Sequence, residues 1–152
     1  DFNAERFYRD ARITNIYEGT TQLQVVAAIG GVIQRVNDQR IGELQQVELK
    51  PHLQRLRKKL DKMYAKHLEA VKYVAEKKDS NYHDLMARSL VDNETYVFVG
   101  YLMLRDAMKD SERENLAERY ILDAVPEFEK RYMTIMSGDF TLIDNHRSII
   151  DY

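Results

Sequence analysis

The chain has 152 residues, of which 44% are hydrophobic and 32% charged, so it is long enough to bury one compact core or two small ones. Its 23 lysines and arginines nearly balance 25 acidic residues, and the net charge of −2 gives no global electrostatic reason to bind nucleic acid or anionic lipid. Because the chain has no cysteine, disulfides and thiolate metal sites are excluded.

Only 2 prolines and 6 glycines interrupt the chain, which is typical of a mostly helical protein. The longest apolar run, residues 96–104, is far too short to span a bilayer. The chain begins with Asp1 and shows no signal-peptide pattern, so we expect a fragment whose natural N-terminus is missing.

Residues 3–12 predict a short helix with Asn3 as its N-cap. After an irregular passage, a second helix is expected from Thr20 or Thr21 to about residue 38. Its apolar residues recur every three or four positions, which predicts a buried face made of Leu23, Val26, Ala27, Gly30, Ile33 and Val36. Gly30 and Gly31 inside this helix are interpreted as a site of close packing against another helix.

The polar residues 37–46 include Gly42 and form the candidate domain boundary. Three longer helices are expected after it, at about 48–78, 82–109 and 112–137. Their predicted buried stripes are Leu49, Leu53, Leu56, Leu60, Met63, His67, Val71 and Val74; then Met86, Leu90, Val97, Tyr101, Leu104 and Met108; then Leu116, Tyr120, Ile121, Ala124, Phe128, Tyr132 and Ile135.

Several local features qualify these helices. Residues 96–104 could form a strand in isolation, but the helical periodicity on both sides favours a buried helix. Pro126 should kink or divide the last helix near residue 124, and Gly138 fits the C′ position after it. The tail either docks through Phe140, Leu142, Ile149 and Ile150 or stays mobile.

Short connections between the long helices predict antiparallel neighbours. The expected fold is therefore all-α: an antiparallel helical bundle of three long helices, preceded by a leading helix-loop-helix. The expected units are residues 1–39, the bundle at 48–137 and a tail at 138–152.

Motifs for phosphate loops and bundle di-iron sites are absent from the sequence. The residues three positions before the four histidines are Leu49, Tyr64, Ser80 and Ile143, so no histidine belongs to a Glu-x-x-His pair and no metal site is predicted. His67, on an apolar stripe, is interpreted as a core or boundary histidine whose hydrogen bonds are satisfied.

The helix at 48–78 is rich in basic residues: Lys50, Arg55, Arg57, Lys58, Lys59, Lys62 and Lys66. They form either a solvated face partly balanced by Asp61 and Glu69, which we favour, or a surface for an anionic partner or a membrane interface. The balanced overall charge argues against a nucleic-acid-binding helix at 50–66.

Glu18 stands in an expected loop between Tyr17 and Gly19. A carboxylate there could transfer a proton, and the glycine would let a substrate approach the backbone closely. From the residues alone, an ordinary surface-loop carboxylate is the better explanation, because a Tyr-Glu-Gly tripeptide is common.

The whole stretch ERFYRDARITNIYEGTTQLQ, residues 5–24, resembles the signature near the C-terminus of flavin-dependent acyl-CoA dehydrogenases. The resemblance is ordered and gap-free over this stretch and extends from residue 1 to about 38. The residues after it resemble the additional C-terminal helical extension of the longer family members. The chain is thus similar to a C-terminal fragment of such an enzyme.

The resemblance implies FAD-dependent α,β-dehydrogenation of acyl-CoA thioesters, with Glu18 as the base that removes the α-proton. It also implies that Tyr17, Glu18 and Gly19 contact the substrate, with the Glu18 backbone N–H donating to the thioester oxygen. Thr20 and Gln22 would lie near FAD, at a helix N-terminus that suits a phosphate.

By the same resemblance, Arg9, Asp10 and Arg12 would form ion pairs that hold the loop. The implied partners are acyl-CoA, an acceptor of the electron-transfer flavoprotein type and further copies of the chain, without nucleic acid and without a membrane span. The bacterial cytoplasm is favoured over the mitochondrial matrix.

The fragment alone is expected neither to retain FAD nor to be active, because most flavin contacts would lie upstream. The alternative hypothesis is that residues 48–152 are a non-catalytic helical interaction or oligomerisation module.

Overall fold

The computed structural model describes residues 4–13 and 20–150, and no residue in this part of the chain is in a strand. The helices are α1 (Ala4–Arg12), α2 (Thr21–Ile33), α3 (Asp38–Gln45), α4 (Gln54–Lys77), α5 (Ser80–Lys109), α6 (Glu114–Met136), α7 (Thr141–Asp144) and α8 (His146–Ile150). Single 3₁₀ turns, Pro51–Leu53 and Ser111–Arg113, precede α4 and α6. The all-α expectation is confirmed, and residues 96–104 lie within α5.

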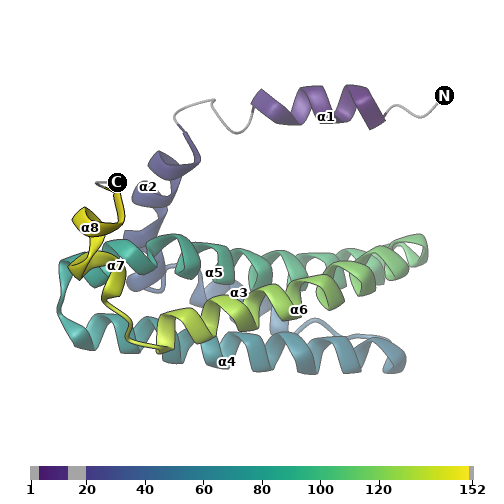
Figure 1. The fold of residues 1–152 in the computed structure, drawn as a ribbon. Coiled ribbons are helices and arrows are strands. Elements are labelled where there is room, and N and C mark those ends of the chain that lie inside the picture. Colours follow the sequence, from purple (N-terminus) through teal and green to yellow (C-terminus); the bar gives the residue numbers. More distant parts are fainter. Residues whose placement is uncertain (1–3, 14–19, 151–152) are drawn as a thin grey trace.

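Helices α4, α5 and α6 run alongside one another and form the bundle, while α2 leaves it at one end (Figure 1). The α4–α5 connection is tight because Lys78 adopts a left-handed conformation and Asp79 caps α5, its carboxylate accepting the Tyr82 N–H at 2.9 Å. Asp110 acts similarly before α6 by accepting the Glu112 N–H at 3.0 Å. These short, capped turns make the neighbouring long helices antiparallel.

Two hydrophobic clusters fill the bundle. The first joins α3 to α4, α5 and α6, and the second joins α2 to the far ends of the same three helices. All eight stripe residues predicted for 48–78 are buried. On α6 the predicted Leu116 is wrong: it is 59% exposed, and its neighbour Ala117 is fully buried instead. A small side chain at this position lets α6 approach the other helices closely, and the larger leucine falls on the rim.

Helix α4 packs tightly against α5 at Gly100. A Cβ at this glycine would lie 2.5 Å from Leu60 Cδ2, and Leu60 itself is fully buried. Because carbon atoms cannot approach so closely, α5 requires glycine here for the two helices to keep their present spacing.

Helix α2 ends earlier than predicted, at Ile33 instead of about residue 38. Its end is a Schellman motif: Arg35 N–H donates to Val32 O and Val36 N–H to Gly31 O, both at 3.0 Å. Arg35 has φ of 58°, a conformation that usually marks glycine, so the sequence carried no visible stop signal.

The buried face of α2 also differs from the prediction. Val25, Ile29 and Val32 are buried, whereas the predicted face is largely exposed, with Leu23 and Val26 about 60% exposed. Apolar residues occur all round this helix, so periodicity could not choose between its faces. The predicted close packing at the glycine pair is wrong for Gly30, because a Cβ there would have no neighbour within 4 Å among the described residues.

The polar segment 37–46 forms α3, and Ile41 and Leu44 of this helix are buried in the first cluster. The division of the chain into units around this segment stays a prediction. Arg57 of α4 ties down the chain after α3, because its guanidinium donates to the carbonyls of Gln45 at 2.6 Å and Val47 at 3.0 Å.

Pro126 does not divide α6, which is continuous from Glu114 to Met136. Its side chain is exposed, and on a solvent-facing side water can replace the hydrogen bond that proline cannot donate. Gly138 has φ of 67°, as expected after this helix.

Among the four predicted anchors of the tail, Phe140 docks, stacking on Tyr82 with ring centroids 4.8 Å apart. Lys77 Nζ lies 4.7 to 5.4 Å from the ring centroids of Tyr73, Tyr82 and Phe140, so cation–π attraction adds to this contact. Leu142, Ile149 and Ile150 are each more than half exposed.

The packing at Leu60 predicts that Gly100→Ala has opposite effects on stability in the wild-type protein and in the Leu60→Ala protein. Leu60→Ala should reduce the free energy of unfolding by about 2–5 kcal/mol, because it leaves a cavity. Gly100→Ala should destabilise the wild-type protein by overpacking. In the Leu60→Ala protein it should stabilise, because its methyl group fills the vacated space and alanine favours the helix.

Chemical denaturation of the four proteins measures this coupling. Leu116→Ala is the matched control, since an exposed leucine should change stability by only about 0.5 kcal/mol. Additive effects of the two core substitutions would contradict the packing described for α4 and α5.

Candidate functional site

The residues that the sequence singled out most strongly, Tyr17, Glu18 and Gly19, lie outside the described part of the chain. The next residues, at the start of α2, are described. Thr20 occupies the N-cap position of α2, and its carbonyl accepts the Gln24 N–H at 3.1 Å, but its side chain makes no capping hydrogen bond. Gln22 is exposed in the first turn and borders a small hollow against α5.

The charged residues of α1 pair within that helix. Arg9 contacts Glu5 at 3.5 Å and Asp10 contacts Arg6 at 3.8 Å, each one helical turn apart. Arg12 donates to the Tyr8 hydroxyl at 3.3 Å and lies over its ring. These exposed contacts each stabilise the helix by about a few tenths of a kcal/mol, the usual amount for such pairs. The loop that they were expected to hold lies outside the described residues.

A pocket of about 350 Å³ lies between α2, the turn that succeeds it and α5. Helix α2 contributes small side chains to the wall, Ala27, Ala28 and Gly31, and α5 contributes Val91 and Phe98. The Schellman end of α2 brings Val36 and Asn37 to one end of the pocket. The walls are therefore mostly apolar.

Glu94 of α5 is the acidic residue of this pocket and is only 8% exposed. Asn37 Nδ2 donates to its Oε1 at 2.6 Å, and His67 Nε2 lies 3.2 Å from its Oε2. Burial raises the pKa of the Glu94 carboxyl, but the hydrogen bonds from His67 and Asn37 outweigh it and hold this pKa below its ordinary value. The carboxylate is therefore ionised at neutral pH.

His67 is buried, as expected for a core histidine, but its hydrogen bonding is only half satisfied. Its Nε2 faces Glu94, whereas its Nδ1 has no partner within the described structure. In the neutral ring, Nε2–H donates to the carboxylate and Nδ1 is left as an unpaired acceptor.

Sequence reasoning missed both Glu94 and Asn37. Glu94 could have been noticed, because it continues the stripe between Leu90 and Val97, so that a carboxylate interrupts a buried face. Asn37 carried no such signal: it is 57 residues away in the chain, and only the fold brings it to Glu94.

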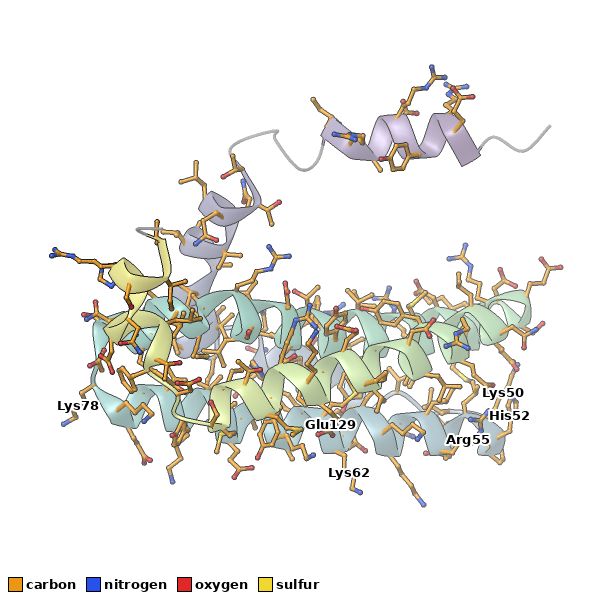
Figure 2. The ribbon with its side chains drawn as sticks, in the orientation of Figure 1. Lys50, His52, Arg55, Lys62, Lys78 and Glu129 are labelled. Atoms are coloured by element: carbon orange, nitrogen blue, oxygen red, sulfur yellow. The ribbon has the colours of Figure 1, made fainter. Side chains whose placement is uncertain are left out.

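Three of the seven basic residues expected on the helix at 48–78 pair with carboxylates of α6, which corrects the expected balance by Asp61 and Glu69. Lys50, Arg55 and Lys66 each contact a carboxylate at 2.6 Å, those of Glu114, Glu118 and Glu129 in turn. Lys50, His52 and Arg55 gather at one end of the bundle, and Lys62 points away from it (Figure 2).

The two acids expected to balance them have other roles. Asp61 accepts from the Tyr101 hydroxyl at 2.6 Å, and Glu69 accepts from the Tyr132 hydroxyl at 2.7 Å. The basic face is thus an inter-helix pairing surface in part, while Lys58, Lys59 and Lys62 are exposed, as expected of a solvated face.

Metal-ligating side chains are dispersed over the described ranges, residues 4–13 and 20–150. Within them, three or more such side chains never come together in a possible metal site. No helix in the same ranges combines the length and apolar character needed to cross a membrane.

Residues 37–141 match the family model described as "Acyl-CoA dehydrogenase C terminal". The matched range holds α3 to α6 and the pocket's Glu94, and it begins after the 5–24 stretch. The fold is similar to the crystal structure of an acyl-CoA dehydrogenase family protein from Porphyromonas gingivalis, with a TM-score of 0.69 and 30% identity. The similarity covers 74% of this chain and 98% of that one. No curated protein sequence matches the chain.

The lowered pKa of Glu94 predicts a pH-dependent contribution to stability. A carboxyl whose folded pKa lies below its unfolded value, here 4.5, stabilises the fold above that value and stops doing so as the pH falls through the folded pKa. We expect Glu94→Gln to destabilise the protein at about pH 5. The difference from wild type should shrink on acidification to about pH 3.

Urea unfolding at several pH values in this window measures the difference. Glu76→Gln is the control, because its exposed side chain pairs only with Lys72 of the same helix and should matter by about 0.5 kcal/mol or less. A gap between wild type and Glu94→Gln that stays constant over the window would show that the carboxylate's hydrogen bonds do not stabilise its ionised form.

Proposed function

This chain belongs to the acyl-CoA dehydrogenase C-terminal family, and we propose on that basis that its parent protein oxidises acyl-CoA thioesters to their α,β-unsaturated forms with FAD. The observation that carries the proposal is the Tyr-Glu-Gly-Thr sequence at 17–20, immediately before α2. It lies outside the matched range, so it supports the assignment independently of the bundle.

Glu18 is the proposed base. An α-proton beside a thioester is too weakly acidic to be removed by a carboxylate in bulk water. The site must therefore bring the pKa of the base and the pKa of the α-proton closer together. Burial beside an acyl chain would raise the pKa of the Glu18 carboxyl and make it a stronger base. The Glu18 backbone N–H would donate to the thioester oxygen as charge develops there, and Tyr17 and Gly19 would line the same site.

The start of α2 fits a bound phosphate group. Its first turn contains no acidic residue, and Thr20 and Gln22 are exposed there, at the N-terminus of a 13-residue helix whose dipole favours an anion. We therefore propose that Thr20 and Gln22 hold the FAD pyrophosphate and adenosine. When bound, FAD would accept the β-hydrogen as hydride, and an acceptor of the electron-transfer flavoprotein type would reoxidise it.

Glu18→Gln in the intact parent protein tests the catalytic assignment. Because the amide cannot accept the α-proton, we expect turnover of acyl-CoA to fall by at least about 10²-fold, with FAD still bound. Dye-coupled turnover and the flavin absorbance of the purified protein are the two readouts.

Glu5→Gln is a suitable control for this experiment, because Glu5 is highly exposed in α1 and, among the described residues, pairs with Arg9 of the same helix. Full turnover in Glu18→Gln would refute its role as base. The isolated 152-residue chain should not form a stoichiometric yellow complex with FAD, since most flavin contacts would lie upstream.

A second function, assembly of copies of this chain, is favoured by the exposed face of α2. Leu23 and Val26 are 59% and 61% exposed side by side, next to open space at Gly30. Apolar side chains in this arrangement are typical of surfaces that become buried on association. We propose that the chain is a homo-oligomer, in which residues 48–137 form a structural unit appended to residues 1–39 and followed by the tail 138–152.

Replacing both Leu23 and Val26 by serine should weaken self-association, measured by analytical ultracentrifugation, without changing the helix content. Leu116→Ser is the matched control, since Leu116 is also 59% exposed but lies on α6. Equal association of the wild type and the α2 variant would exclude this face as the interface.

A further inference from the structure

We propose that the pocket between α2 and α5 binds a small organic cation, an ammonium group on a short apolar body, with Glu94 as its counter-ion. This site is separate from the proposed dehydrogenase chemistry at Glu18, and the failure of either assignment would leave the other standing.

The shape of the pocket favours a small ligand. Its volume of about 350 Å³ lies near the lower end of the range typical of small-molecule sites. The α2 wall consists of Ala27, Ala28 and Gly31, so the backbone of that helix is accessible to a ligand. Val91 and Phe98 provide the facing apolar wall on α5. An alkyl group of a few carbon atoms can therefore be buried between the two helices.

The charge of the pocket decides the class of ligand. Glu94 is more than nine-tenths buried, and buried carboxylates normally pair with a cation. Within the described structure its hydrogen-bond partners are the Asn37 amide and the His67 ring, and no lysine or arginine forms an ion pair with it. Asn37 is neutral, so it donates a hydrogen bond but removes no charge.

His67 contacts Glu94 through Nε2 alone, and its Nδ1 is buried with no partner within the described residues. As a neutral ring it donates one hydrogen bond to the carboxylate and leaves the negative charge of Glu94 in place. Asp38, next to Asn37, adds negative potential, although it is itself paired with Arg35. The pocket is therefore a mostly apolar space with one carboxylate that no lysine or arginine neutralises within the described structure.

Each carboxylate oxygen of Glu94 accepts one hydrogen bond in the structure and has capacity for another. An ammonium group would supply both the donor and the positive charge, and its attraction to the carboxylate would be strengthened by the apolar surroundings. A neutral alcohol of the same shape would supply only the donor, and a carboxylate would be repelled.

The experiment titrates the 152-residue chain with three probes of matched size at constant ionic strength: n-butylammonium, n-butanol and butyrate. Backbone amide chemical shifts are followed by heteronuclear NMR. We expect saturable shifts with n-butylammonium, confined to residues 27–37 and 91–98. Binding of n-butanol should be at least about 10-fold weaker, and butyrate should not bind. Equal responses to the three probes, or shifts spread over the surface, would overturn the proposal.

Two variants separate charge from shape. Glu94→Gln keeps the size of the side chain, so it should abolish the preference for n-butylammonium over n-butanol. Ala28→Leu leaves Glu94 in place and fills the pocket from an exposed helix position, so it should prevent binding of both probes. Undiminished binding of n-butylammonium by the folded Ala28→Leu protein would show that the cation sits elsewhere.

Discussion

The contact between Leu60 and Gly100 sets the spacing of α4 and α5, and most of the remaining structure is arranged around these two helices. Because Gly100 has no side chain, α5 can lie close enough for Leu60 to be fully buried against it. Helix α6 follows the same principle with Ala117 and Ala124 on its buried face. The large residues Tyr101 and Phe128 then fill the space between the three helices. Small residues determine how close the helices come, and aromatic residues fill what is left.

Polar groups inside the bundle connect its parts in a second way. Glu94 accepts hydrogen bonds from α4, through His67, and from the turn after α2, through Asn37. This network lies beside the second hydrophobic cluster, where Val25, Ile29 and Val32 hold α2 against the bundle. The helix that carries the proposed flavin-binding end is thus held to the bundle by apolar contacts and, through the turn after it, by the hydrogen bond from Asn37 to Glu94. A change of charge at Glu94 would therefore act on the position of α2.

The chain combines two kinds of sequence with different physical demands. Residues 5–24 carry the polar and charged groups to which proton transfer and cofactor binding are assigned in the proposal. Their described residues form few contacts with the bundle. Residues 37–141 carry periodic apolar stripes that suit packing, and this is the range that the family model matches. The proposed catalytic role therefore belongs to the first part, and the proposed assembly role depends on the stability that the second part provides.

The sequence by itself determined the three long helices, most of their buried stripes and the end of the last one before Gly138. These features depend on interactions within a few residues: 3.6-residue periodicity, capping side chains and a glycine at a positive φ. The resemblance of residues 5–24 to a family signature, and not local physical reasoning, singled out Glu18, Thr20 and Gln22, whose roles stay predictions.

Only the tertiary structure decided which face of α2 is buried, because that helix is apolar all round and its neighbours choose the side. It also decided that Asn37 meets Glu94, since residues 57 positions apart are brought together by packing and not by any local rule. The stop at Arg35 and the exposure of Leu116 have the same origin. Local patterns say which residues share a surface, and long-range packing determines what that surface meets.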